Sequence, residues 1–437
     1  MKRLLSLLLV GALGVLAWAL PVPETQESPT TTVPVAVVAT TSSHSTCPWA
    51  FSDDVIDTFF VAQSENDADL RFTFPVGGEI RRTVEESQVG PAATALSLAG
   101  VLNQGVSPAV VEFSSTSSAA GIVETGEGVL AADICPSASS KIWHLPGGST
   151  LEGQTLRLVL FNPFSDDARA SITVTSEAGF EPIPEFESVS VAGRSWKVID
   201  LGKLLPLRES ISVAIDMKQG VITPAMVLSE GDDEAVWTNE GQADQWDFPV
   251  ADAGGLTPRL SISNDGAGPV DYEIDGYSTT GAEAALLTGT LDGRSQVQLD
   301  VSGLVEGVFG LRLRTSGPVA ATLVADDGVR VAATAGVTLQ ATRWMLPGFG
   351  MAGTSTLWVM NTGAETATVT YRLLDSGGAL GEVEKVAVLP GRVLAVPTVP
   401  IGASALVLEA NHPISVAWTM ERDGAIAYAS GVPMAHQ

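Results

Sequence analysis

The feature that most constrains this chain is a repeat that begins with tryptophan. Trp143, Trp246 and Trp344 each open a Trp-x-(Leu/Phe)-Pro sequence, and Trp49 opens a degenerate copy that lacks the proline. The successive spacings are 94, 103 and 98 residues. A period of this length indicates four copies of one structural unit. The units expected on this basis are 47–142, 143–245, 246–343 and 344–437.

The three later copies share the same order of strand and turn signals. A strand with alternating apolar residues ends in asparagine, whose side chain bonds its own backbone and turns the chain. A second alternating strand follows, then a Gly-Arg turn, and finally a hairpin with an Asp-Gly or other acidic tip. The asparagines are Asn162, Asn264 and Asn361, and the Gly-Arg pairs are Gly193-Arg194, Gly293-Arg294 and Gly391-Arg392.

Six or seven short strands per hundred residues are typical of a β-sandwich. No segment after the first twenty residues carries a long helical period. The sequence therefore predicts an all-β chain of four tandem immunoglobulin-like β-sandwich units. A β-propeller is less favoured, because one blade usually takes only about 40–50 residues.

The N-terminus has the pattern of an export signal. Lys2 and Arg3 precede an apolar run at 4–20, and 17 residues of helix reach about 25 Å, slightly short of a ~30 Å hydrocarbon core. The signal is either cleaved after Ala19 or kept as an uncleaved anchor, and the sequence leaves both alternatives open. In either case the chain contacts the membrane only through residues 4–20. Both place the rest of the chain outside the cytoplasm. Residues 21–46, rich in Pro, Thr and Ser, are expected to form a disordered stalk.

These landmarks resemble a family of secreted or membrane-anchored actinobacterial cell-envelope proteins that is classed as a domain of unknown function. The resemblance rests on the Trp-x-x-Pro openings, the strand-ending asparagines and the Gly-Arg turns, and it covers most of the chain after the stalk. The first unit departs from the pattern, since Gln63 stands about where asparagine is expected. The family has no known catalytic residues, so the resemblance implies an extracytoplasmic, envelope-associated role.

The two cysteines of the chain, Cys47 and Cys135, lie at the two ends of the first unit. An exported chain with two cysteines favours a single disulfide, which here would close the divergent unit. Two separate thiols and a shared metal site are the alternatives, and no histidine cluster accompanies the cysteines to support the metal site.

Composition and motifs exclude several classes of function. Fifty acidic residues against 23 basic ones give a net charge of −27, which repels nucleic acid. No nucleophile elbow, zinc-binding His-Glu-x-x-His or phosphate-binding glycine loop occurs, so we expect no catalytic residue, cofactor or metal ion. Acidic clusters without the alternating calcium-binding pattern are interpreted as charged hairpin tips, with calcium binding left open. These clusters are Ser165–Asp167, Glu230–Glu234 and Asp326-Asp327.

Two tryptophans are candidates for surface binding. Trp358 lies between Leu357 and Val359, whose side chains should point inward, so its ring should point to the opposite face of the strand. Trp237 lies near the end of a hairpin. Exposed rings at these positions would stack on sugars or on a partner, and an interdomain contact is an equally good account of Trp358. The repeated tryptophans and Trp418 are expected to pack in or between units.

The sequence favours a non-enzymatic extracytoplasmic envelope protein that acts as a spacer, scaffold or protein-interaction and adhesion module. The first alternative is a protein that binds cell-wall or capsular carbohydrate. The second is a glycan-processing enzyme, which would need only two suitably spaced carboxylates. The expected partner is therefore an envelope protein or a cell-surface glycan.

Overall fold

The structure is a computed structural model, and it describes residues 44–434 apart from 103–104, 137–139, 240, 252–253, 308 and 399–401. The expected signal or anchor at 1–20 and most of the expected stalk lie outside the described residues. The last stalk residues, 44–46, instead belong to strand β1 (His44–Cys47). Among the described residues, no helix is long and apolar enough to cross a membrane.

The prediction of an all-β chain is confirmed. Helical structure in the described residues is limited to the single turns α2 (Leu98–Val101), α3 (Leu201–Leu204) and the 3-10 turn η1 (Pro184–Phe186). All strand pairs are antiparallel, as short connections require.

The first unit contains two four-stranded sheets. One has the order β1, β8 (Ala109–Phe113), β4 (Ala68–Val76) and β5 (Glu79–Gln88). The other has the order β10 (Leu130–Cys135), β9 (Ser118–Thr125), β3 (Asp57–Ser64) and β6 (Ala92–Ser97). A short pair, β2 (Phe51–Ser52) with β7 (Gly105–Val106), lies beside them.

The second unit repeats this plan. Its first sheet has the order β11 (Ile142–Pro146), β17 (Ile211–Gln219), β13 (Ala168–Ser176) and β14 (Gly179–Glu181), with β15 (Val189–Val191) also paired to β13. Its second sheet has the order β16 (Ser195–Asp200), β12 (Gln154–Asn162), β18 (Thr223–Glu230) and β19 (Asp233–Trp237).

In the third and fourth units one long strand passes through both sheets. In the third, β25 (Phe309–Asp326) pairs first with β20 (Ala243–Phe248) and β22 (Val270–Ser278), and then with β21 (Thr257–Asn264) and β26 (Val331–Ala335). The strands β23 (Ala282–Leu291) and β24 (Ser295–Asp300) complete these sheets.

The fourth unit uses β32 (Ala405–Arg422) in the same way. This strand pairs with β27 (Ala341–Pro347) and β29 (Ala367–Asp375), and then with β28 (Thr354–Asn361) and β33 (Ala425–Ser430). The remaining strands are β30 (Gly378–Val388), β31 (Arg392–Thr398) and β34 (Val432–Pro433).

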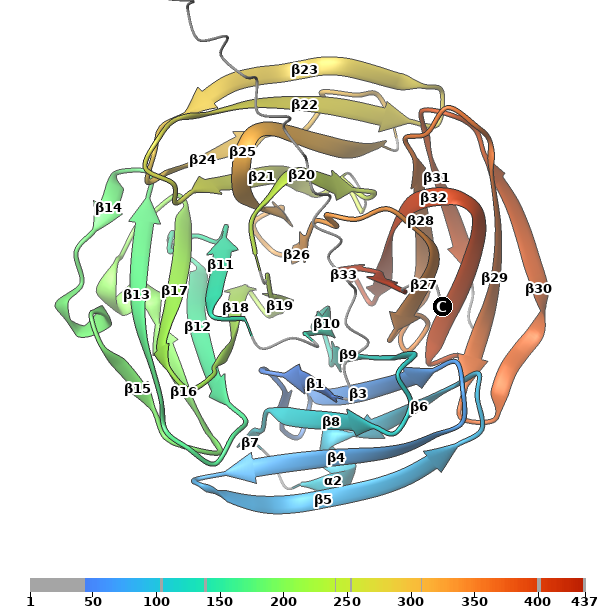
Figure 1. The fold of residues 1–437 in the computed structure, drawn as a ribbon, viewed down its shortest axis with the longest axis horizontal. Helices are drawn as coiled ribbons and strands as arrows, with labels where there is room; N and C mark the ends of the chain where they lie inside the picture. Colours follow the sequence, from blue (N-terminus) through green and yellow to red (C-terminus); the bar gives the residue numbers. More distant parts are fainter. Residues whose placement is uncertain are drawn as a thin grey trace, which may run out of the picture. The chain divides into compact units, whose positions relative to one another are not determined.

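The four units close on one another, which corrects the expectation of a tandem string. Their innermost strands contact in a cycle: β10 with β19, β19 with β26, β26 with β33, and β33 with β10 (Figure 1). Each hydrophobic core also takes in residues from a neighbouring unit. The first core includes Val159 of the second unit, the second Val324 of the third, the third Met360 of the fourth, and the fourth Val123 of the first. The arrangement is four-bladed and propeller-like.

The innermost strands of the cycle are buried on both faces. In β10, β19, β26 and β33 nearly every residue is buried, including those that alternation alone would turn to solvent. A strand buried on both faces reads as a continuous apolar run, and small residues such as Ala427 and Ala429 let the sheets approach closely. The blade-length argument against a propeller was wrong because each blade here is a sandwich of two sheets.

The repeated turns follow the predicted chemistry. The side-chain nitrogen of Asn162 donates to Asp166 O (2.8 Å), Val191 O and Ala192 O, and Asn264 and Asn361 make equivalent bonds. At Gly193 an added Cβ would lie only 2.0 Å from Ser165 O, so the turn cannot accept a side chain there.

In the first unit the residue equivalent to these asparagines is Ser64, not Gln63. Ser64 pairs with Ala92 in the same register as Asn162 with Ser195. The side-chain nitrogen of Gln63 instead donates to Leu406 O of the fourth unit at 3.1 Å. Gln63 therefore helps to close the cycle between the first and last units.

The predicted disulfide is present between Cys47 and Cys135, whose Cα atoms are 4.7 Å apart. These residues end β1 and β10, the innermost strands of the two sheets of the first unit. The bond therefore ties the two sheets together beside the centre of the ring.

Candidate functional site

The two tryptophans proposed for surface binding are buried, which corrects that prediction. Trp358 is 4% exposed, its Nε1 donates to Thr419 Oγ1 at 3.1 Å, and its ring belongs to the core of the third unit. Trp237 is 0% exposed and donates to Pro146 O at 3.1 Å. Trp237 packs in the core of its own unit, whereas the ring of Trp358 lies on the second face of its strand, which meets the third unit rather than solvent. For Trp358 the interdomain alternative is therefore right.

The repeated tryptophans at the unit openings and Trp418 are also buried. Trp246 donates to Val319 O at 2.9 Å, which ties β20 to β25, and Trp344 donates to Ala341 O at 3.0 Å within its own strand β27. The tryptophan repeat is a packing signal, as the sequence predicts.

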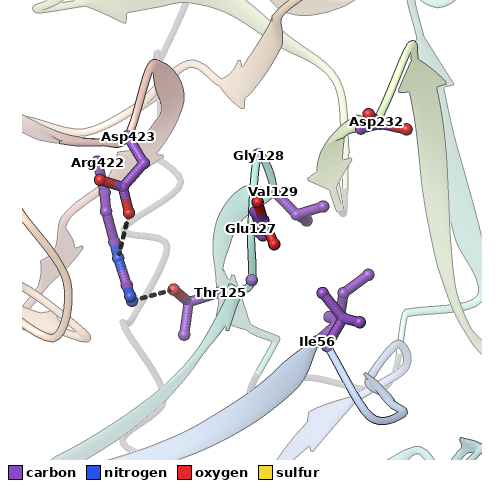
Figure 2. A pocket seen from close by; sticks show the side chains of 10 residues that line it. Ile56, Thr125, Glu127, Gly128, Val129, Asp232, Arg422 and Asp423 are labelled. Atoms are coloured by element: carbon purple, nitrogen blue, oxygen red, sulfur yellow. Dashed lines mark hydrogen bonds and ion pairs between the residues drawn. The ribbon is translucent and has the colours of Figure 1, made fainter.

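The hairpin tips nearest the axis surround an open hollow of about 960 Å³ (Figure 2). The tip 125–129 of the first unit, Asp232 of the second unit and Arg422-Asp423 of the fourth unit line it, together with Val55 and Ile56. Three units thus contribute to one surface. We refer to it as the axial hollow.

The charges in the axial hollow are unbalanced. Glu127, Asp232 and Asp423 are exposed, whereas Arg422 is its single basic lining residue. That guanidinium is already engaged, because Nη1 donates to Thr125 Oγ1 at 2.8 Å and Nε lies 3.2 Å from Asp423 Oδ2 (Figure 2). The hollow therefore attracts positive charge.

Directly behind the tip of the second unit, the buried carboxylate of Asp233 connects the four blades. Its Oδ1 accepts the backbone N–H of Leu130 at 3.1 Å, and its Oδ2 accepts that of Val331 at 3.1 Å. The backbone of Ile426 also bonds to it. Burial raises the pKa of Asp233 to about 7, and these N–H groups oppose the rise.

A second buried cluster joins the first and second units. Trp49 Nε1 donates to Glu124 Oε2 (3.2 Å) and to Glu234 Oε1 (2.9 Å), so one indole is shared by two carboxylates. Arg157 lies 3.4 Å from Glu234 and places its guanidinium 5.7 Å from the centre of the Trp49 ring. Ser229 Oγ donates to Glu234 Oε2 at 2.9 Å.

Burial raises the pKa of both glutamates in this cluster. For Glu124 the neighbouring charge of Glu234 adds to the effect of burial, while Trp49 and Arg157 oppose it. Two buried carboxylates that share one donor favour a state in which a proton remains bound.

Asp133 is a third buried acid at this junction. Its Oδ2 accepts the backbone N–H of Thr238 at 2.8 Å and the Thr238 hydroxyl at 3.1 Å. Burial raises the pKa of Asp133 to about 7, with the bonds from Ile134 and Thr238 acting in the opposite direction. Like Asp233, it is a carboxylate used as a tie between blades.

The sequence interpretation placed Asp233 and Glu234 in a solvated hairpin tip, and it did not single out Glu124 or Asp133. Asp233 and Glu234 belong to the cluster Glu230–Glu234, yet they are buried, whereas Asp232 is exposed. The signal that could have found them was the apolar run that follows each of them. The other proposed calcium clusters bond within the protein: Asp167 accepts Gly193 N–H at 3.0 Å, and Asp327 pairs with Arg330.

The fold and its junctions define a class of protein: an all-β, propeller-like ring of four two-sheet blades with one disulfide. The profile of the family of unknown function DUF5719 matches residues 84–235 and 235–432. The chain therefore belongs to that family. No curated protein matches it.

Among solved structures, the chain is similar to the "Crystal structure of tetra-tandem repeat in extending region of large adhesion protein". The identity is 13%, the match covers 87% of this chain and 93% of that one, and the TM-score is 0.11. A score this low does not show a shared fold.

Proposed function

We propose that this protein is a non-enzymatic extracytoplasmic envelope protein that acts as a protein-interaction scaffold. Its disulfide fits an oxidising compartment outside the cytoplasm. The closed ring favours a scaffold over a spacer, because four closed blades do not extend as a string would. The buried carboxylates are engaged in ties between blades, which supports a structural rather than a catalytic use for them.

The axial hollow is the docking face in this proposal, and its occupant is a positively charged segment of a partner protein. The observation that carries the assignment is the net charge of −2 on the hollow, where three exposed carboxylates accompany one arginine that is paired with Asp423. Charge complementarity of this kind steers a basic partner and fixes its orientation.

Crosslinking in intact envelopes tests the proposal. The hollow variant combines Glu127→Gln, Asp232→Asn and Asp423→Asn, and the control variant neutralises three exposed glutamates elsewhere. These control substitutions are Glu185→Gln, Glu283→Gln and Glu382→Gln. We expect crosslinks from the hairpin tips to Lys- or Arg-rich segments of a partner, lost in the hollow variant and kept in the control.

Salt provides a second readout, since exposed charge pairs weaken as ionic strength rises. Crosslinks that map away from the hairpin tips, or equal capture by the hollow and control variants, would contradict the docking face. Turnover of an envelope glycan by the purified chain would contradict the non-enzymatic assignment.

A further inference from the structure

A second concave surface lies between the first and second units and shares no lining residue with the axial hollow. One wall is a face of the sheet β1-β8-β4-β5, and the other is the turn that follows Asn162. Its volume is about 590 Å³, within the range of small-molecule sites. The backbone N–H of Gly78 donates to Arg194 O at 3.3 Å and bridges the two units beside it. We call this surface the blade cleft.

The sheet wall of the blade cleft carries an ordered polar row. Arg71 on β4 lies directly opposite Glu85 on β5 and Glu112 on β8. The guanidinium is 3.0 Å from Glu85 and 3.7 Å from Glu112, and all three side chains are at least half exposed. In the next row of the same face, Thr73 lies opposite Thr83. Donors and acceptors thus alternate at fixed spacing across three strands.

The opposite wall presents the ring of Phe164, which is 45% exposed. Its position is fixed, because Phe164 N–H donates to Asn162 Oδ1 at 3.0 Å. The same position of this turn holds Asn66, Gly266 and Gly363 in the other units, each with the equivalent bond. The turn therefore does not require an aromatic residue. Phe164 therefore gives this wall of the cleft an exposed apolar ring that the turn itself does not need.

We propose that the blade cleft binds a neutral carbohydrate. A sugar ring has an apolar C–H face that packs on an aromatic ring such as Phe164. Its hydroxyls both donate and accept, so one saccharide satisfies the Glu85 and Glu112 carboxylates and the Arg71 guanidinium together. The four charged residues that line the cleft, Arg71, Glu85, Glu112 and Arg194, sum to zero, so the cleft does not select for a charged glycan. Trp358 and Trp237 have no part in this site.

Affinity measurements with the full chain test the proposal. The probes are neutral hexasaccharides of glucose, mannose and galactose, each titrated free and then presented on an insoluble matrix. At least one is expected to bind, and Phe164→Ala to weaken that binding by about tenfold or more. Phe180→Ala is the matched control, because Phe180 is 63% exposed on the same unit and does not line the cleft.

Glu85→Gln provides a second variant on the sheet wall, where the side chain is exposed and its loss leaves the core intact. It is also expected to weaken binding. The proposal would be overturned if none of the probes were retained or if the Phe164 and Phe180 variants bound equally. A preference for a peptide over the saccharides would also overturn it. The hollow variant defined above should bind saccharide normally, which separates failure of this site from failure of the docking face.

Discussion

The buried acid Asp133 makes the stability of the ring depend on pH. Its pKa rises from an ordinary 3.8 to about 7 in the folded chain, a difference of about three pH units. At 1.36 kcal/mol per unit, the unfolding free energy is about 4 kcal/mol higher when Asp133 is protonated than when it is ionised. Because the pKa of Asp133 is higher in the folded chain than in the unfolded chain, its contribution to the unfolding free energy is complete below pH ~4. This contribution is lost as the pH rises through ~7.

Asp133→Asn removes this titration and keeps an oxygen that accepts the two bonds from Thr238. From pH 5 to pH 8 the wild-type chain should lose about 2.5 kcal/mol of unfolding free energy that the variant does not lose. The assay is urea denaturation at both pH values with the disulfide intact. The control is Asp244→Asn, because that side chain is exposed. Equal pH dependence in the wild type and the Asp133 variant would refute the reasoning.

Three further predictions concern the ties within and between blades. Reduction of the Cys47–Cys135 disulfide opens a loop whose ends are 88 residues apart in sequence. It should lower the unfolding free energy by up to about 4–5 kcal/mol. An unchanged melting curve in the presence of reductant would be inconsistent with this. Gly121→Ala places a Cβ 2.8 Å from a backbone oxygen of the fourth unit, so the melting temperature of this variant should fall by several degrees. The control is Gly281→Ala, whose Cβ meets nothing within 4 Å, and it should melt like the wild type. Trp49→Phe removes the N–H shared by two buried carboxylates and should cost about 1–3 kcal/mol in urea denaturation at pH 8; wild-type stability there would count against the shared donor.

Local structure could be predicted from the sequence because its causes are local. An asparagine that bonds its own turn, as Asn162 does, imposes the same geometry in each copy. In two of the Gly-Arg pairs the glycine is required by close backbone contact, at Gly193 and Gly293, and in the third, at Gly391, by a positive φ. The disulfide followed from the number and position of the cysteines. These features depend on a few neighbouring residues, which the sequence displays directly.

The closed ring could not be predicted in the same way because it depends on contacts between units. The alternation around Trp358 correctly places its ring on the second face of the strand. Whether that face meets solvent or the third unit is decided by β28 packing against a sheet about one hundred residues away in sequence. The burial of Asp133 and Asp233 has the same origin, since neighbouring blades exclude water from them.

The blade cleft illustrates the same division. The aromatic character of Phe164 and its place after Asn162 are visible in the sequence. Its partners Arg71 and Glu85 are more than seventy residues earlier and join it only when the first two blades close together. Sequence reasoning therefore chose the larger tryptophans, which the fold uses for packing.

Small-angle X-ray scattering of a chain that begins at His44 tests the closed ring most directly. About 390 residues in one compact body give a radius of gyration of roughly 21 Å. Four separate units of the same size in a line give roughly 38 Å. A value near 21 Å is the result that the ring requires, and a value near 38 Å would show that the blades do not close on one another.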